Sequence, residues 1–369
     1  MTTTDDYYLD YETGTIINPD IIYAAPCSLQ DTWQFAHRFC PVVYSLVFVL
    51  AVVGNILVLC VVRRYRLSRL GPCSFSLTDT FLLHLAVSDL LLALTLPFYS
   101  VQWVQGWVFG NVGCKIAGAF FSLNLYSGIL FLACISFDRY LAIVHAVSVG
   151  WRRNTCHAQI ACAVIWVACL SLATIDIQYR QVLDLPHSNI RVCQLVFSPS
   201  SSKEWQVALQ LVNLVLGFGL PLLVMLYCYV RIFRSLCHAS RRQKRKSLHL
   251  IVSLVSVFLL CWAPYNSFRL ADSLQRLGVI GRSCSINHAL DIGTLVSESL
   301  GLAHCALNPL LYGFVGMKFR RELMEMWKGL LASFGFLGLD GWGQGQKRHR
   351  APGSFSSESE NTSYFSVVV

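Results

Sequence analysis

The strongest constraint on the fold is one long apolar run over residues 112–147, VGCKIAGAFFSLNLYSGILFLACISFDRYLAIVHAV. Cys114 stands near its start and the charged pair Asp138 and Arg139 near its end, and Cys114 and Arg139 are 25 residues apart. A helix rises about 1.5 Å per residue, so this stretch is about 37 Å long and crosses a hydrocarbon core about 30 Å thick. The run therefore predicts a transmembrane helix with a thiol at one water interface and an acid–base pair at the other.

The composition is that of a membrane protein with several spans. The chain has 369 residues, of which 55% are hydrophobic and only 13% are charged, whereas soluble domains carry about 25% charged residues. Residues 1–38 are polar and acidic and contain no apolar core of a signal peptide. We therefore expect the first apolar segment to carry this N-terminal tail across the membrane.

Seven apolar segments are long enough to span a bilayer. They cover approximately residues 40–63, 78–102, 112–144, 157–178, 206–234, 249–272 and 288–313. Several contain proline, which a membrane helix tolerates as a kink because neighbouring groups satisfy the freed carbonyls. We therefore expect an all-α membrane protein, with a seven-transmembrane helix bundle over residues 39–315.

The distribution of Lys and Arg predicts the orientation, because cytoplasmic loops are enriched in these residues. They gather in connections 1–2, 3–4 and 5–6 and after span seven: Arg63, Arg64, Arg66 and Arg69; Arg152 and Arg153; Arg241, Arg242, Lys244, Arg245 and Lys246; Lys318, Arg320 and Arg321. We therefore expect these connections inside the cell, the N-terminus outside, and a multi-pass protein of the plasma membrane.

The N-terminal tail over residues 1–38 carries Tyr7, Tyr8 and Tyr11 among four acids. One interpretation is a solvated, disordered end, as for most acidic tails. The other is an extracellular strip that binds a basic partner, strengthened by tyrosine sulfation. The tyrosines favour the second interpretation.

The C-terminal end divides into two segments. Residues 316–334 alternate basic and apolar side chains at helical spacing, which predicts an amphipathic helix on the inner leaflet of the lipid bilayer. The segment 335–369 reads as a disordered cytoplasmic tail, either simply solvated or phosphorylated by kinases so that it recruits a basic partner. The candidate phosphorylation sites are Ser354, Ser356, Ser357, Ser359, Thr362 and Ser363.

Polar residues within the spans are functional candidates, because they are costly in a membrane. Asp89 lies in the middle of the second span, and Asn124 and Asn308 stand at similar depth in the third and seventh. Together they form a candidate sodium site. A polar network that only stabilises packing is the alternative, and the sequence does not separate the two.

Two acids lie toward the outer ends of the spans, Asp272 in the sixth and Glu298 in the seventh. Trp103 closes the second span and Tyr126 lies in the third. A cavity lined by these acids and aromatic rings would suit the cationic end of a peptide. For Asp272 the alternative is an ion pair with Arg269 or Arg276 near the membrane interface.

Other functional classes lack their signatures. The chain shows no Ser/His/Asp arrangement at plausible depth, no HExxH and no glycine-rich phosphate loop, so we expect no enzyme, no required cofactor and no nucleic-acid partner. A transporter would be expected to show internal repeats or paired broken helices. A transporter or channel is therefore the weaker alternative of a different class.

The ordered motifs resemble those of the rhodopsin-like G-protein-coupled receptors across about residues 40–333. They are Gly54-Asn55, Leu85-Ala86-Val87-Ser88-Asp89, Asp138-Arg139-Tyr140, Trp166, Pro221, Tyr229, Cys261-Trp262-Ala263-Pro264 and Asn308-Pro309-Leu310-Leu311-Tyr312. Thr95-Leu96-Pro97 and the acidic, tyrosine-bearing tail are similar to those of the chemokine receptors of the CXC class. Each motif is weak by itself, but their order on seven spans is specific.

This resemblance implies two disulfides, Cys114 with Cys193 and Cys27 with Cys284. It also implies that a basic CXC chemokine docks on the tail and inserts its N-terminus near Glu298 and Asp272. Binding would favour outward movement of the sixth helix about Pro264, as a shift between existing states. Ligand contacts would then come from Tyr7, Tyr8, Tyr11, Trp103, Tyr126, Asp272 and Glu298.

On the inner side, the resemblance implies that Arg139 pairs with Asp138 at rest and contacts a heterotrimeric G protein of the inhibitory class when active. Coupling and activation would rest on Asp138, Arg139, Tyr140, Tyr229, Trp262, Pro264, Asn308, Pro309 and Tyr312. Receptor kinases and arrestin would act on the phosphorylated tail, and the outcome would be chemotaxis of leukocytes.

Two departures and one rival accompany the resemblance. The fourth span ends Ala173-Thr174-Ile175-Asp176, without the proline that is common there, and Glu298 is an acid found in only part of the subfamily. Both bear on which ligand is bound. The rival is a scavenging receptor that internalises chemokine without G-protein coupling, and the intact Asp138-Arg139-Tyr140 favours signalling instead.

Overall fold

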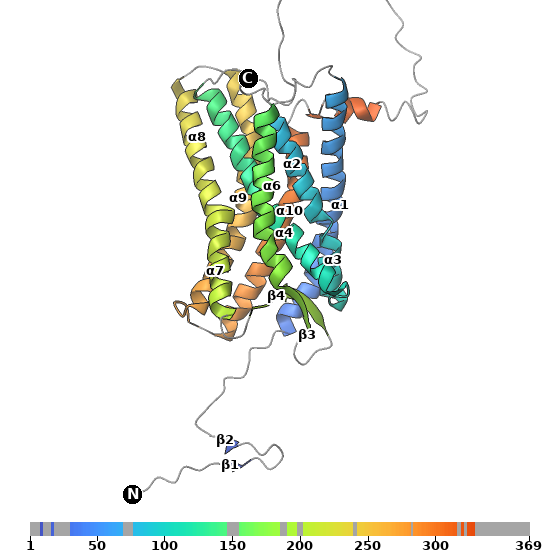
Figure 1. Cartoon of the computed structure of the whole chain (residues 1–369), viewed down its shortest axis with the longest axis vertical. Helices are drawn as coiled ribbons and strands as arrows, with labels where there is room; N and C mark the ends of the chain where they lie inside the picture. The colour runs from blue at the N-terminus through green and yellow to red at the C-terminus, as the bar shows by residue number, and fades with distance from the viewer. Residues whose placement is uncertain are drawn as a thin grey trace, which may run out of the picture.

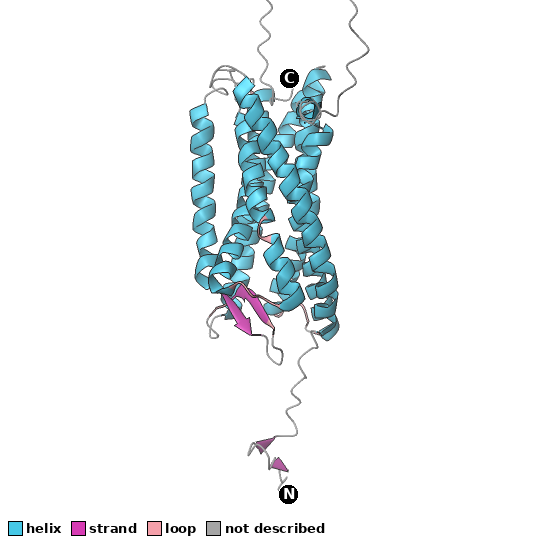
Figure 2. Ribbon diagram, turned by 90° about the vertical axis from the view of Figure 1, so that its right-hand side faces the viewer, coloured by secondary structure: helices cyan, strands magenta, loops and turns pink. Residues whose placement is uncertain are grey.

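The computed structural model is a bundle of long helices that run side by side, with a short β-hairpin across one end (Figure 1, Figure 2). The structure describes residues 8–9, 16–17, 30–68, 77–145, 155–184, 190–197, 202–238, 242–281, 283–315, 319–320 and 323–328. The helices are α1 (Gln30–Ser68), α2 (Leu77–Ala93), α3 (Leu96–Gln105), α4 (Gly110–Ile143), α6 (Thr155–Tyr179), α7 (Ser202–Leu214), α8 (Leu220–His238), α9 (Arg242–Arg276) and α10 (Cys284–Val315).

The helices confirm the expected seven-span architecture. Six helical stretches in the described part of the chain are long and apolar enough to cross a membrane: Asp31–Arg64, Leu77–Gln105, Gly110–Ile143, His157–Tyr179, Glu204–Ser235 and Val252–Arg276. The remaining long helix, α10, packs against both α1 and α9 and closes the bundle. The chain is therefore a multi-pass membrane protein.

Helix α4 is the centre of the bundle and packs against α2, α6 and α8. Ile129, Phe131 and Ile135 on this helix are completely buried. The outward faces of the peripheral helices are apolar as well, as shown by the exposure of Val167 on α6 and Phe233 on α8. Helices that are apolar on all sides suit a membrane, where the outer face meets lipid instead of water.

Two of the expected spans are interrupted by local irregularities next to proline. The second span is divided at Leu94 and Thr95 into α2 and α3, because Pro97 has no N–H to donate to the helix. The Thr95 hydroxyl donates to the Leu92 carbonyl oxygen at 2.7 Å and stabilises the bend. In the fifth span a π-helical turn, η2 (Val215–Gly219), joins α7 to α8 just before Pro221.

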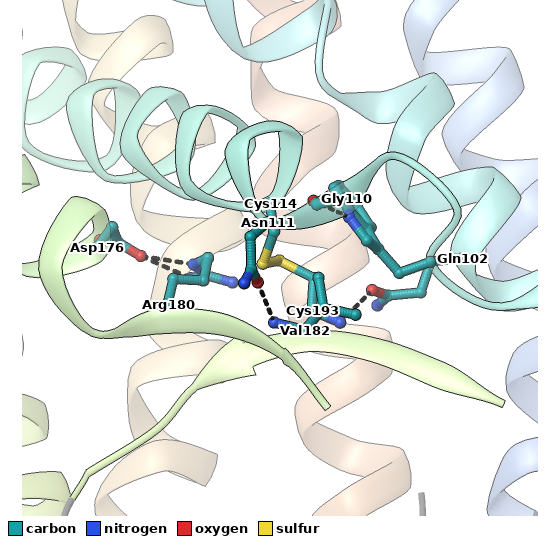
Figure 3. Close-up of a disulfide and its surroundings, with 9 residues drawn as sticks. Gln102, Gly110, Asn111, Cys114, Asp176, Arg180, Val182 and Cys193 are labelled. Carbon is teal, nitrogen blue, oxygen red and sulfur yellow. Dashed lines mark hydrogen bonds and ion pairs between the residues drawn. A yellow bond between two sulfur atoms is a disulfide. The ribbon is translucent and has the colours of Figure 1, made fainter. Parts of the chain in front are cut away.

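One end of the bundle is covered by strands β3 (Arg180–Asp184) and β4 (Arg191–Leu195), which pair antiparallel with Val182 opposite Cys193. The disulfide Cys114–Cys193 ties this hairpin to the start of α4 and confirms the expected bridge (Figure 3). Around it, Asn111 Oδ1 accepts from the Val182 N–H at 2.8 Å and Gln102 Oε1 accepts from the Cys193 N–H at 2.9 Å. The hairpin is thus held to both α3 and α4.

The ends of the chain are described only in part. Helix α1 begins at Gln30, so the last residues of the segment expected as a tail, 30–38, are helical. Strand β1 (Tyr8–Leu9) pairs with β2 (Ile16–Ile17), whereas Tyr7 and Tyr11 lie outside the described residues. Cys284 is disulfide-bonded, but its expected partner Cys27 is not described.

At the C-terminal end, residues 319–320 and 323–328 are helical, within the segment expected to form an amphipathic helix. In the red-orange part of Figure 1 they lie across the direction of the bundle, beside the end of α1 that is opposite the β3–β4 hairpin. All six candidate phosphorylation sites lie outside the described residues.

Candidate functional site

A cavity of about 390 Å³ lies at the hairpin end of the bundle, between α4, α6, α7, α9 and α10. Strand β4 contributes to its wall through Cys193, Gln194 and Leu195. The disulfide therefore positions part of the cavity wall as well as the hairpin.

Two of the side chains expected at this site line the cavity, Tyr126 and Glu298. Tyr126 is buried on α4 and its hydroxyl donates to the Asn213 side-chain oxygen on α7. Glu298 projects from α10 and is partly exposed. The sequence thus predicted that one aromatic and one acidic side chain of the lining, Tyr126 and Glu298, lie at this cavity.

Two other expected side chains are not part of the lining. Asp272 accepts hydrogen bonds from Arg276 Nε at 2.9 Å and from Gln210 Nε2 at 3.0 Å, so the ion-pair alternative is the one that the structure adopts. The indole of Trp103 packs on Trp33 with ring centroids 5.1 Å apart, at the outer end of α1. Side chains of neighbouring helices contact both residues. The hydrophobic pattern of a single span does not show which neighbours it will meet, so the sequence did not predict these contacts.

The cavity also contains an ion pair that the sequence did not predict. Asp176, at the end of α6, bonds to Arg180, the first residue of β3, at 2.7 Å (Figure 3). The Ser122 hydroxyl on α4 also donates to Asp176. Burial alone would lower the pKa of the Arg180 guanidinium, but Tyr99 and Asp176 beside it raise its pKa above the ordinary value. The i,i+4 spacing of Asp176 and Arg180 was the signal that could have indicated this pair.

The lining carries charges of both signs. Arg180, Arg269 and Arg276 face the cavity together with Asp176 and Glu298. The expectation of a lining of acids and aromatic rings was therefore wrong in its charge balance. The reason is the face of α9 on which Tyr265, Arg269 and Arg276 recur at helical spacing, since that face turns toward the cavity.

A continuous row of rings leads from this cavity toward the middle of the bundle. Tyr265 contacts the buried Trp262 edge to face, with ring centroids 5.6 Å apart, and Trp262 contacts His304 at 5.6 Å. The indole lies directly on Gly301, where an added Cβ would be 3.0 Å from the ring. Any side chain larger than hydrogen at Gly301 would displace Trp262, so α10 sets the position of this ring.

The row ends at the candidate sodium site. Asp89 is completely buried and accepts hydrogen bonds from Asn308 Nδ2 at 2.8 Å and Asn124 Nδ2 at 3.1 Å. His304 Nε2 lies 3.6 Å from Asp89 Oδ1, beyond hydrogen-bond distance. The structure therefore brings all three predicted residues together on α2, α4 and α10.

This cluster has oxygen atoms to offer a cation. Among the described side chains, Asn124 Oδ1 and Asn308 Oδ1 are buried and accept no hydrogen bond. Unpaired buried acceptors beside a buried carboxylate are costly unless a donor or cation satisfies them. The residues present thus fit a small hard cation with oxygen ligands.

At the end of the bundle opposite the hairpin, Arg139 is held in place by two neighbours. Arg139 Nη2 donates to Asp138 Oδ2 at 2.6 Å and also to the Thr78 hydroxyl of α2. That hydroxyl in turn donates to Asp138 Oδ2 at 2.6 Å. Only 1% of Arg139 is exposed, so the guanidinium is not accessible to a partner in this conformation.

Thr78 is a functional candidate that the sequence reasoning missed, because nothing in the local pattern links it to Arg139. The other predicted inner residues lie nearby: Tyr229 bonds to Ser136 at 2.9 Å and Tyr140 to His145 at 2.8 Å. Pro264 and Pro309 lie inside α9 and α10. The side chain of Tyr312 lies outside the described part of the chain.

Comparisons with known proteins agree with this geometry. The model of the family "7 transmembrane receptor (rhodopsin family)" matches residues 54–312. The chain is 66% identical to C-X-C chemokine receptor type 3-2 of Danio rerio, over 97% of this chain and 96% of the relative. It is 40% identical to C-X-C chemokine receptor type 3 of Homo sapiens, over 89% and 85%. C-X-C chemokine receptor type 5 of Rattus norvegicus is 42% identical, over 79% and 77%.

Proposed function

We propose that this chain binds a basic C-X-C chemokine outside the cell and activates a heterotrimeric G protein inside. The chain belongs to the rhodopsin family of seven-transmembrane receptors and, within it, to the C-X-C chemokine receptors. The members of this family are receptors and not enzymes. The location is the plasma membrane, with the N-terminus outside. The observation that supports signalling most directly is Arg139, intact and held by Asp138 and Thr78 below a charged outer cavity.

Ligand binding would involve two regions. The acidic tail over residues 1–38 would bind the basic folded part of the chemokine, and complementary charge would make the encounter fast and salt-sensitive. The flexible N-terminus of the ligand would then enter the outer cavity, where its amino group would reach Glu298 beside Tyr126. Asp272 has a structural role in this proposal, because Arg276 and Gln210 already hold its carboxylate.

Activation would connect the cavity to Arg139 through the row of rings. A ligand contact at Tyr265 reaches Trp262 directly, and Trp262 stands two residues before Pro264 on the same helix. Outward movement of α9 about Pro264 would open the inner end and release Arg139 for the G protein. We assign the G protein to the inhibitory class and the cellular outcome to chemotaxis of leukocytes.

We also propose that sodium regulates this equilibrium. Asp89 would hold the ion through its carboxylate, and Asn124 and Asn308, which now donate their N–H groups to that carboxylate, would turn their unpaired amide oxygens to the ion. When bound, the cation neutralises the buried carboxylate and ties α2, α4 and α10 together. Receptor kinases would modify the serines and threonine between residues 354 and 363, and arrestin would bind the phosphorylated tail.

The test is made in cells that express the full chain. A panel of C-X-C chemokines is applied, and inhibition of cyclic AMP, arrestin recruitment and internalisation are measured for the wild type, Arg139→Ala and Arg64→Ala. Arg64 is an exposed arginine of α1 and serves as the matched control. We expect one or more chemokines to lower cyclic AMP in the wild type and in Arg64→Ala, and to bind Arg139→Ala without that response.

The opposite result identifies the rival function. A chemokine that is bound and internalised without any G-protein response in the wild type would make the chain a scavenging receptor. A measured ion or solute flux would instead support a transporter or channel.

A further inference from the structure

The last turns of α9 are joined to α7 by hydrogen bonds between side chains. Gln210 of α7 donates from Nε2 to Asp272 Oδ2 at 3.0 Å and accepts from the Ser273 hydroxyl. Arg276 donates from Nη1 to Gln206 Oε1 at 2.7 Å and from Nε to Asp272 Oδ2 at 2.9 Å. We call these five side chains the α7–α9 clasp.

The α7–α9 clasp is tightly packed. Ser273 is 1% exposed and Gln210 is 8% exposed. The cavity that remains beside them, between the two helices, has a volume of about 10 Å³, which is room for a single water. Arg269, one turn before the clasp, also attracts Asp272 electrostatically. The two helices are therefore in direct contact here, and both neutral and charged hydrogen bonds cross the contact.

The same end of α9 is also fixed to α10. Gln275 Nε2 donates to Asn287 Oδ1 at 2.9 Å, and Gln275 is 7% exposed. Two turns earlier, the Phe268 ring lies on Gly293 of α10, where an added Cβ would collide with the ring. Contacts of fixed geometry thus hold this end of α9 on two sides.

The part of α9 before Pro264 is held in a different way. Its buried side chains, such as Leu254, Val255 and Phe258, belong to the apolar core of the bundle. Among the described residues, no side chain of 252–263 makes a hydrogen bond or an ion pair with another helix. Apolar contacts are non-directional and can be exchanged during a movement, whereas hydrogen bonds require a fixed geometry. The part before Pro264 is therefore the easier one to move.

We propose that the α7–α9 clasp keeps the last turns of α9 in place when a ligand fills the outer cavity, so that only the part before Pro264 moves. Gln210, which bonds to both Asp272 and Ser273, is then a positioning residue for signalling. Without it, a bound ligand displaces the end of α9 away from α7, and the movement does not release Arg139. This inference rests on the proposed receptor function and concerns how the signal crosses the bundle.

A direct contact with the ligand is the alternative role for the clasp, because Gln206, Gln210 and Arg276 also line the outer cavity. The two roles predict different measurements. Losing a ligand contact lowers the affinity, whereas losing a positioning residue leaves the affinity unchanged and lowers the response per bound ligand. Interhelical hydrogen bonds in membranes change an equilibrium by about 3-fold on average and by at most about 20-fold.

The experiment compares affinity and response in cells that express the full chain with a surface tag. The probe is the most potent C-X-C chemokine of the panel, fluorescent for binding and native for cyclic AMP inhibition. Binding is measured on membranes with a non-hydrolysable GTP analogue, so that coupling to the G protein does not change the affinity. Gln210→Met keeps the length of the side chain and removes its hydrogen bonds. Gln178→Met is the matched control, because Gln178 is an exposed residue of α6 outside the cavity lining.

We expect Gln210→Met to bind the chemokine with the affinity of the wild type. Its ratio of potency to affinity should fall by about 3- to 20-fold, because the end of α9 is no longer held. Gln178→Met should match the wild type in both measurements.

An exchange of charge tests the bond between Gln210 and Asp272 itself. Gln210→Glu places two carboxylates side by side, and Asp272→Asn removes the carboxylate that Gln210 and Arg276 share, so each variant alone should reduce the response. The double variant again places one amide donor opposite one carboxylate and should recover most of the response.

Three results would overturn the inference and leave the proposed function intact. They are a wild-type response in Gln210→Met, an equal fall of affinity and potency in that variant, and no recovery in the double variant. If Gln210→Met fails to reach the surface, Ser273→Ala, which removes the hydroxyl bonded to Gln210, is measured under the same criteria. If no chemokine of the panel changes cyclic AMP in the wild type, the proposed function fails and this inference fails with it.

Discussion

Removing the Thr78 hydroxyl should activate the receptor without a ligand. This hydroxyl bonds to both Arg139 and Asp138 in the resting arrangement, where Thr78 is 1% exposed. Thr78→Val keeps the shape of the side chain but removes both hydrogen bonds. Because valine offers no donor or acceptor, the resting state is weakened, while an active state in which Arg139 has left loses little.

The magnitude follows from the two charged hydrogen bonds. A hydrogen bond to a charged group contributes about 1.5–3 kcal/mol, so weakening the resting state by even about 1.4 kcal/mol raises the ratio of active to resting receptor about tenfold. Minor states of a two-state protein have populations of about 0.1–10%. An active fraction of about 1% would therefore rise to about 10% in Thr78→Val.

The assay is ligand-independent suppression of cyclic AMP at matched surface expression, with Thr78→Ser as the control that keeps the hydroxyl. We expect Thr78→Val to lower basal cyclic AMP and Thr78→Ser to behave as the wild type. Equal basal cyclic AMP in Thr78→Val and the wild type would refute the role assigned to this hydroxyl. A rise in Thr78→Ser as large as in Thr78→Val would refute it too.

Three further predictions concern the outer hairpin, the cavity wall and the buried carboxylate. Cys114→Ser or Cys193→Ser should reduce the amount of receptor at the cell surface, because a bridge across 79 residues stabilises a fold by about 4 kcal/mol. The double variant should reach the surface in the same amount as either single variant, because each change breaks the same bridge. Gly118→Ala should weaken agonist potency at normal surface expression, because an added Cβ would collide with the Arg180 side chain, whereas an unchanged potency would show that Arg180 has no influence on the ligand. Asp89→Asn should abolish the dependence of agonist affinity on sodium at constant ionic strength, and a wild type whose affinity does not respond to sodium would rule out the proposed site.

Much of the architecture could be predicted from local sequence, because a bilayer constrains each span separately. Length and apolarity identified the spans, whereas the sides that Lys and Arg in the loops indicate stay a prediction. The three residues of the candidate sodium site were predicted as a group, since ionisable and amide side chains stand out in apolar helices. The sequence predicted these spans as uninterrupted helices, and this was wrong for two of them. The second span divides next to Pro97, and a π-helical turn precedes Pro221 in the fifth.

The charge balance of the cavity could not be predicted in this way. Asp272 and Arg269 lie within one turn of each other on α9, but Arg276 and Gln210 hydrogen-bond to Asp272, while Arg269 faces the cavity. Arg180 reaches the cavity only because Gly118 leaves space beside it. These outcomes depend on how each helix is rotated and on which side chains of the neighbouring helices lie within reach.

The sequence by itself determined that the chain spans a membrane with seven helices, that Asp89, Asn124 and Asn308 lie at similar depth in three of them, and that Arg139 lies near the end of the long third span. Each of these follows from a free energy that one segment experiences alone, the transfer of its side chains into lipid or water. Only the tertiary structure decided which charges are paired, that Thr78 holds Arg139, and that Arg269 and Glu298 share a cavity. Pairing depends on distances between helices that are far apart in the chain, and these distances exist only after the bundle has packed.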